Sequence, residues 1–215
     1  MLIHLVFKDL LIVKKYILLV FLVAACVPPF LLWRNPELAA ALGNVFAVAF
    51  GVLMPLMYLG EKENQYSKAS LLLAATPYPR KWMVVSKYLV SLLMFCVCTG
   101  IFWLETLIFP SLGGFNAALA AVLFLLVSLF LSLYLPLYYK IGHDNTKYIF
   151  VVVIMAVPIL TGALDQMPGL GAGLREIMAT LTPPLFFAAL IVGSLAFLAA
   201  SAILAVRFYE RADLV

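Results

Sequence analysis

The sequence predicts an all-α, polytopic membrane protein, and three observations support this fold class. Apolar residues make up 66% of the 215-residue chain, and charged residues make up only 11%. Soluble domains are about 45–50% apolar and about 25% charged. The apolar residues also fall in runs of about 20 residues, the length that a helix needs to cross a bilayer. We therefore expect one transmembrane domain over residues 1–215, with lipid as its solvent.

Six segments are long and apolar enough to be transmembrane helices. They are Tyr16–Trp33, Leu38–Leu59, Trp82–Phe109, Phe115–Tyr139, Tyr148–Leu164 and Leu185–Phe208. The fifth segment is short and carries Pro158 near its centre, so we expect it to be broken or partly re-entrant.

The positions of lysine and arginine predict the orientation of these six spans. Only Arg34 and Arg175 fall on one side of the membrane, and twelve basic residues fall on the other. The twelve are Lys8, Lys14, Lys15, Lys62, Lys68, Arg80, Lys81, Lys87, Lys140, Lys147, Arg207 and Arg211. The positive-inside rule then places both termini in the cytoplasm. Anionic lipid accounts for the net charge of +4, which requires no nucleic acid as a partner.

Residues 1–14 precede the first span and have the pattern of a helix lying in the membrane interface. One broad apolar face is predicted from Leu2, Leu5, Val6, Phe7, Leu10 and Val13. Such a helix would turn into the membrane at Lys14-Lys15. A frayed extension of the first span is the alternative.

Small residues recur at every fourth position of the second span. They are Ala39, Gly43, Ala47 and Gly51. This spacing lets another helix approach closely, either in this chain or in a second copy. The cysteines Cys26, Cys96 and Cys98 all lie in apolar spans, and we interpret them as small buried hydrophobic residues.

Residues 61–81 form a polar segment between the second and third spans. A packed helix face is predicted from Tyr66, Ala69, Ser70 and Leu73, at positions i, i+3, i+4 and i+7. Pro77 would end this helix, and Pro79 suits the first turn of the next, which begins at Arg80. The segment is either a solvated connector or a helix that docks on a cytoplasmic partner. Its polar face of mixed charge beside a stiff elbow favours docking.

Several enzyme classes are excluded by what the sequence lacks. ATP binding by a phosphate loop needs a glycine-rich turn followed by lysine and serine or threonine, and the only glycine-rich stretch, Gly169–Gly173, has no such lysine. The two histidines, His4 and His143, lie outside the spans and have no nucleophile or metal-ligand partners in the pattern. We expect no catalytic site, no metal site and no cofactor in this chain.

Three polar residues within the spans are candidates for a transport pathway. Glu105 lies about a turn from the outer end of the third span, where it could also extend to the outer interface. Ser128 and Ser132 share a face of the fourth span, where they could also serve helix packing. An outer loop is predicted over residues 165–184.

Two blocks of the sequence resemble the ABC-2 type permeases of ATP-binding-cassette transporters. The first lies within Tyr58–Tyr88 and contains Glu61-Lys62-Glu63-Asn64, Ser70-Leu71-Leu72, Thr76-Pro77-Tyr78-Pro79-Arg80 and Ser86-Lys87-Tyr88. The second contains Phe7-Lys8-Asp9-Leu10 and Lys14-Lys15-Tyr16. Within the family, the chain is most similar to the short permeases of bacterial peptide exporters, including the phenol-soluble modulin exporters.

This resemblance implies that residues 1–14 are an elbow helix and that Glu61–Ala75 is a coupling helix that inserts into a cytoplasmic ATPase. The residues that it assigns to ATPase coupling are Glu61, Lys62, Glu63, Asn64, Gln65, Tyr66, Ser67 and Lys68, with Pro77, Pro79 and Arg80 as the elbow that follows. The family often has an acidic residue where this chain has Gly60, which leaves the start of the coupling helix open.

The resemblance also implies a function. Two permease subunits, identical or different, would work in a bacterial cell membrane with two ATPase subunits that bind ATP and Mg. Together they would export an amphipathic or hydrophobic substrate such as a peptide. The alternative is a membrane anchor or sensor that recruits a cytoplasmic partner and transports nothing.

Overall fold

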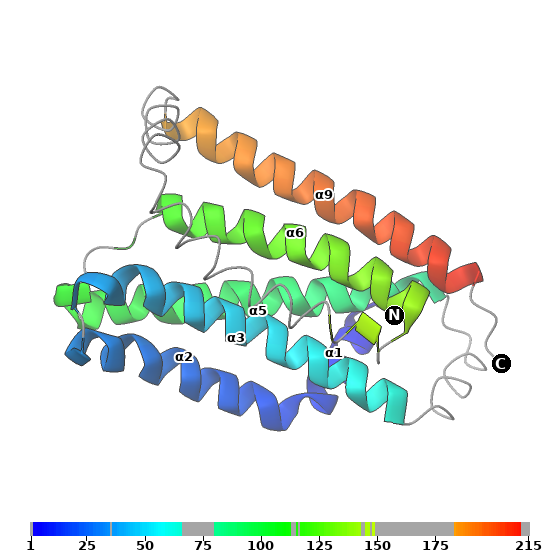
Figure 1. Ribbon diagram of the computed structural model, residues 1–215, viewed down its shortest axis with the longest axis horizontal. Helices are drawn as coiled ribbons and strands as arrows, with labels where there is room; N and C mark the ends of the chain where they lie inside the picture. Colours follow the sequence, from blue (N-terminus) through cyan, green and yellow to red (C-terminus); the bar gives the residue numbers. More distant parts are fainter. Residues whose placement is uncertain are drawn as a thin grey trace.

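The computed structural model describes residues 2–34, 36–65, 80–112, 117–142 and 183–211, together with residues 115, 145, 146 and 148. Five long helices run along one axis of the molecule (Figure 1). They are α2 (Lys14–Arg34), α3 (Pro36–Gln65), α5 (Arg80–Ile108), α6 (Ala117–Ile141) and α9 (Pro183–Arg211). A short helix, α1 (Leu2–Ile12), and a 3-10 turn, η1 (Pro110–Leu112), complete the elements. The described residues contain no strand, so the all-α prediction is confirmed for them.

Each of the five long helices contains a stretch long and apolar enough to cross a bilayer. These stretches are Lys14–Trp33, Gly43–Glu63, Lys81–Ile108, Leu119–Ile141 and Phe187–Glu210. Large apolar side chains also cover the outside of the bundle, as at Leu18, Trp33, Ile108 and Val192. Such a surface suits lipid and not water. The chain is a multi-pass membrane protein.

The order of the helices leaves one predicted span untested. α2, α3 and α5 alternate in direction, whereas α6 and α9 run the same way (Figure 1). Two contacts fix this parallel register: the Tyr139 and Tyr209 rings lie 5.0 Å apart, and the Ser201 hydroxyl donates to the Ser132 carbonyl at 2.9 Å. Consequently α6 ends and α9 begins at opposite ends of the bundle. The predicted fifth span lies between them, outside the described residues apart from Tyr148, so six spans stays a prediction.

Basic residues gather at one end of the bundle. We call it the basic end: α2 begins, α3 ends, α5 begins and both α6 and α9 end there (Figure 1). The basic residues of this end in the described helices include Lys14, Lys15, Lys62, Lys81, Lys87, Lys140 and Arg207. Which side of a membrane the basic end faces stays a prediction from the charge distribution.

α1 is a helix of its own that ends at Ile12, two residues before the predicted turn at Lys14-Lys15. A turn at Val13 joins it to α2. α1 packs mainly on α5; its buried residues are Leu5 and Asp9, and Val13 in the turn that follows is buried too. Of the predicted apolar face, Leu5 is buried and Phe7 is exposed, and the charged Asp9 is buried against α5. That α1 lies in a membrane interface stays a prediction.

Two glycines of the small-residue stripe of α3, Gly43 and Gly51, pack against other helices of the same chain. A Cβ added to Gly43 would lie 3.0 Å from the Pro28 Cβ of α2, and one added to Gly51 would overlap the Cys98 Sγ of α5. Glycine at these two positions therefore allows α3 to sit close to both neighbours, as the spacing predicted. The cysteine interpretation holds only for Cys98, since Cys26 and Cys96 are exposed on the outside of the bundle.

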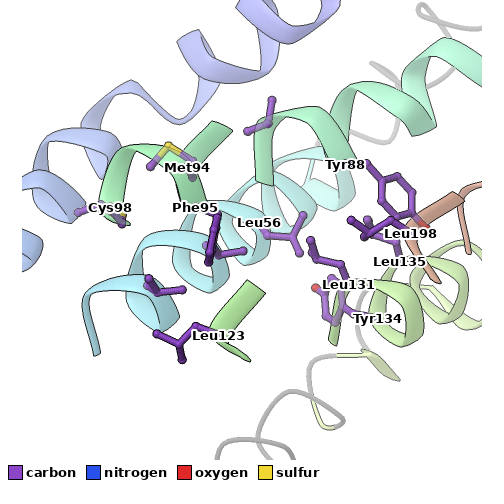
Figure 2. Close-up of a cluster of buried hydrophobic side chains, with 14 of the residues drawn as sticks. Leu56, Tyr88, Met94, Phe95, Cys98, Leu123, Leu131, Tyr134, Leu135 and Leu198 are labelled. Carbon is purple, nitrogen blue, oxygen red and sulfur yellow. The ribbon is translucent and has the colours of Figure 1, made fainter. Parts of the chain in front are cut away.

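A continuous apolar core joins the helices. Figure 2 shows Tyr88 of α5, Leu198 of α9 and Leu135 of α6 gathered at one point of this core, with Met94 and Cys98 farther along α5. The Phe95 ring of α5 lies 5.2 Å from the Phe124 ring of α6. α5 thus occupies the centre of the bundle, where it contacts α1, α2, α3 and α9.

Candidate functional site

Residues 66–79 connect the end of α3 to the start of α5. Sequence reasoning placed the start of a separate helix at Glu61, but Glu61–Gln65 instead continue α3. Gln65 holds this last turn together, because its Nε2 donates to Glu61 Oε1 at 2.9 Å and its Oε1 accepts from Lys62 Nζ at 2.9 Å. With no proline after Pro55 in α3, nothing ends the helix at Leu59, where the second span was predicted to end.

A buried ion pair joins the end of α3 to the start of α5. The Lys87 ammonium of α5 contacts the Glu63 carboxylate of α3. The Lys87 side chain is 5% exposed, whereas that of Glu63 is 28% exposed. The Tyr138 hydroxyl of α6 donates to the same Glu63 oxygen at 3.2 Å. The pair therefore links three helices at the basic end.

Two aromatic rings of α6 complete the surroundings of Lys87. Its Nζ lies 4.4 Å from the centre of the Tyr138 ring and 5.1 Å from that of Tyr139. A cation over an aromatic face gains about 0.5–2 kcal/mol, with the larger values at desolvated sites. The rings and the Glu63 carboxylate together compensate for a charge that would cost several kcal/mol if it were buried alone. We refer to Glu63, Lys87, Tyr138 and Tyr139 as the charged cluster.

A second polar contact beside the charged cluster holds α1 on α5. The Ser86 hydroxyl donates to Asp9 Oδ2 at 2.7 Å, and Lys8 Nζ lies 3.2 Å from Asp9 Oδ1. Burial raises the pKa of Asp9 above its ordinary value, although Lys8, Ser86 and Lys87 act in the opposite direction. The N-terminal helix is therefore fixed to the residue that precedes Lys87.

Hydroxyl groups connect α5 to α9, and α9 to α6. Tyr88 Oη and Ser201 Oγ of α9 lie 2.6 Å apart, and Ser201 in turn donates to the Ser132 carbonyl of α6. Nearer the basic end, the Tyr209 hydroxyl of α9 lies 3.7 Å from Met83 Sδ of α5. The first two turns of α5 thus contact α1, α3, α6 and α9 through polar groups.

Of the residues predicted to couple to an ATPase, the structure describes Glu61–Gln65. Glu61 and Gln65 are exposed, Lys62 is half-buried, and Glu63 turns inward to the charged cluster. Asn64 and the elbow residue Arg80 are described only as parts of helices. The other predicted residues of this segment, Tyr66, Ser67, Lys68, Pro77 and Pro79, lie outside the described residues, as does the outer loop over residues 165–182. The coupling role stays a prediction.

Glu105 lies inside the bundle and does not extend to its surface. It is 6% exposed, and neither carboxylate oxygen has a hydrogen-bond partner among the described residues. α3 and α5 are antiparallel, with Gly51 on Cys98 and Glu63 on Lys87. Extending that register by two turns places Asn44 opposite Glu105. Its Oδ1 is also buried and has no hydrogen-bond partner in the part of the chain that the structure describes, so α3 and α5 each carry an unsatisfied polar group far from the basic end.

The two serines predicted to line a pathway bond to their own helix. Ser128 Oγ donates to the Leu125 carbonyl, and Ser132 Oγ donates to the Leu129 carbonyl, each at 2.8 Å. The Ser132 carbonyl also accepts from Ser201, so this position belongs to the contact between α6 and α9. The geometry favours helix packing at Ser132, and the pathway role of both serines stays a prediction.

Sequence reasoning missed the charged cluster, although one signal pointed to it. Lys87 lies five residues inside the predicted third span, and a charge inside a span marks a polar contact. It was grouped instead with the basic residues of the flanking segment. Its partner Glu63 lies 24 residues earlier and was assigned to the docking face. Residue spacing along a single helix cannot reveal a pair that forms between two helices.

The comparison with protein families decides what kind of membrane protein this is. The family described as "ABC-2 family transporter protein" matches residues 4–210, nearly the whole chain. The chain belongs to this family. No curated protein and no solved structure matches the chain. Among the described residues, no group of His, Cys, Asp and Glu side chains is placed to hold a metal ion.

Membership of the ABC-2 family assigns a role to the fold. These proteins are the transmembrane component of their transporters and are not themselves catalytic, and they work with an ABC ATPase at the membrane. For this ABC-2 permease, the charged cluster lies at the root of the segment that was predicted to meet the ATPase. It is therefore our candidate functional site.

Proposed function

We propose that this chain is the permease subunit of an ATP-driven exporter in a bacterial cytoplasmic membrane. Two permease subunits and two cytoplasmic ATPases would form the transporter, with ATP and Mg bound by the ATPases. The segment that begins at Glu61 would be the contact with the ATPase. An amphipathic or hydrophobic molecule such as a peptide would be the substrate.

The observation that supports this proposal is the charged cluster. Residues 66–79 leave α3 just after Glu63 and enter α5 seven residues before Lys87, and the two side chains are paired. A force applied to this segment would therefore reach α3 and α5 as one unit. A solvated connector would need no buried charges at its root, and burying them is costly.

The contacts of α5 indicate how such a force would spread. Ser86 would carry it to α1, the rings around Lys87 would carry it to α6, and Tyr88 would carry it to α9 through Ser201. ATP binding that draws two ATPases together would then favour one arrangement of the two permease bundles over another. This is a population shift driven by differential affinity, with α5 as the central element.

The apolar interior favours an amphipathic or hydrophobic substrate. Within the described residues, the buried charged side chains are Asp9 and Lys87 at the basic end and Glu105 toward the other end. Between them the buried side chains are mostly apolar, with a few serines and no charged residue among those that the structure describes. A substrate with many charges would find few partners there, whereas an amphipathic peptide would lose little on entering.

Reconstitution tests the proposal against a membrane anchor or sensor. The chain and the ATPase that copurifies with it are placed in proteoliposomes, and hydrolysis and movement of amphipathic peptides are measured. An exporter should show peptide-stimulated hydrolysis and ATP-dependent transport. Binding of the ATPase with no transport of any amphipathic or hydrophobic substrate would refute export and leave an anchor.

Glu61 offers a sharper test of docking than Glu63. Glu61→Lys reverses an exposed charge and should uncouple hydrolysis from transport without disturbing the fold. Glu210→Lys is the matched control, because Glu210 is also exposed at the basic end but lies on α9. Full transport in the Glu61 variant, or equal losses in both variants, would contradict docking at this segment.

A further inference from the structure

A groove with cationic residues at one end runs between α5 and α9 at the basic end of the bundle. Its volume is about 390 Å³. The walls are formed by Trp82 and Val85 of α5 and by Ala202, Ile203 and Val206 of α9. The aliphatic stems of Lys81 and Arg207 complete the lining, which is apolar throughout.

The two basic residues of the groove lie at the same level of the bundle. Lys81 begins the apolar stretch of α5, and Arg207 lies three residues before the end of that of α9. Both are exposed, and neither forms an ion pair with any residue of the described helices. Lys81 Nζ instead lies 5.6 Å from the centre of the Trp82 ring. Tryptophan beside a basic residue at the end of a span is typical of the headgroup region.

We propose that this groove binds an anionic phospholipid of the leaflet that the basic end faces. The phosphate diester would lie between Lys81 and Arg207, and one acyl chain would follow the apolar wall past Val206 and Ile203 toward the membrane interior. Charge complementarity selects this occupant. A second copy of the chain would bring the same two positive charges against each other, whereas an anionic lipid brings one negative charge and an apolar chain.

The position of the groove gives such a lipid a consequence for the transporter. Lys81 is the last residue of the segment predicted to couple to the ATPase, and Met83, two residues later, is contacted by Tyr209 of α9. A lipid held between Lys81 and Arg207 would brace the start of α5 against the end of α9. Lipid binding itself does not depend on the proposed transport function, since it can be measured on the chain alone.

Native mass spectrometry of the purified full-length chain tests the proposal. Delipidated protein is titrated with phosphatidylglycerol or phosphatidylcholine, and the dissociation constant of the first bound lipid is measured. We expect tighter binding of phosphatidylglycerol. Each basic residue near an anionic headgroup contributes on the order of fivefold, so Lys81→Gln with Arg207→Gln should weaken binding roughly thirtyfold.

Two further variants keep the test specific. Lys14→Gln with Lys15→Gln removes the same charge from exposed positions on α2 at the same end, and should change the dissociation constant less than threefold, by order of magnitude. Ile203→Trp fills the groove at a side chain that is 57% exposed and keeps both charges. It should weaken binding of phosphatidylglycerol without changing the fold, checked by circular dichroism.

Three results would overturn the proposal. The first is equal binding of the two lipids by the unmodified chain. The second is an equal loss of lipid affinity in the Lys81/Arg207 double variant and in the Lys14/Lys15 control, which would mean surface attraction without a site. The third is unchanged lipid binding in Ile203→Trp together with loss of a dimer in the same spectra, which would assign the groove to a second copy of the chain.

Discussion

Replacing Glu63 by glutamine should cost more stability than replacing Lys87, although the two side chains form one ion pair. The reason is their unequal burial, with 5% of the Lys87 side chain exposed against 28% of Glu63. Without Glu63, the buried ammonium keeps only the rings of Tyr138 and Tyr139. Without Lys87, the Glu63 carboxylate keeps the Tyr138 hydroxyl and can still reach water.

These environments set the expected magnitudes. Removing one partner of a buried ion pair costs about 3–5 kcal/mol, and the rings place Glu63→Gln near the lower limit, about 3 kcal/mol. Lys87→Gln should cost about 1 kcal/mol, since a partly exposed carboxylate loses little more than a surface pair does. The double variant removes both charges and should be less destabilised than Glu63→Gln alone, by about 2 kcal/mol.

Equilibrium unfolding in mixed dodecyl maltoside and SDS micelles measures these differences. Loss of helix is followed by circular dichroism, and the free energy of unfolding is obtained for each variant and for the unmodified chain. Equal losses in the two single variants would refute the argument from unequal burial. Additive losses in the double variant would show that the two charges do not interact in the folded protein.

Three other predictions follow from contacts described above. Gly51→Ala should destabilise the chain by about 1–3 kcal/mol through overlap with Cys98 Sγ, and Cys98→Ala should partly rescue it. Gly100→Ala has open space at its Cβ and should stabilise the chain by about 0.5–1 kcal/mol. Thermal unfolding of the unmodified chain, the two single glycine variants and the Gly51/Cys98 double variant checks this. Because burial raises the pKa of Asp9, the folded protein binds a proton at this carboxyl group more tightly than the unfolded chain does. The contribution of Asp9 to stability therefore falls as pH rises from the ordinary aspartate range to the raised pKa. Asp9→Asn should flatten that part of the pH profile of unfolding, and an unchanged profile would contradict this. Glu105→Gln removes a buried carboxylate without a partner and should raise the free energy of unfolding by about 1 kcal/mol, whereas a loss of stability would show that the carboxylate binds a cationic group.

The long helices could be predicted from the sequence because each depends on a local property. A run of apolar residues is sufficient to define a span, and five predicted spans lie within a few residues of the observed ones. The close approach at Gly43 and Gly51 was also predictable, since spacing along one helix determines which residues share its face.

What could not be predicted depends on contacts between helices. Asp9 is polar and was left out of the apolar face of α1, yet Ser86 makes its burial possible from 77 residues away. Glu63 has the pattern of an exposed helix end, and only the position of Lys87 explains why it turns inward. In both cases the partner decides which side of the helix is buried, and neither partner is visible from the local sequence.

The contact between α1 and α5 has a consequence for how the protein is made. Ser86 is synthesised 77 residues after Asp9, a delay of roughly 4–15 seconds at about 5–20 residues per second. During this time α1 lacks the surface of α5 on which it packs in the folded protein. Lys87 differs, because Glu63 leaves the ribosome before it. The counterion of this lysine is therefore synthesised first, so Lys87 can form its ion pair as soon as α5 packs on α3.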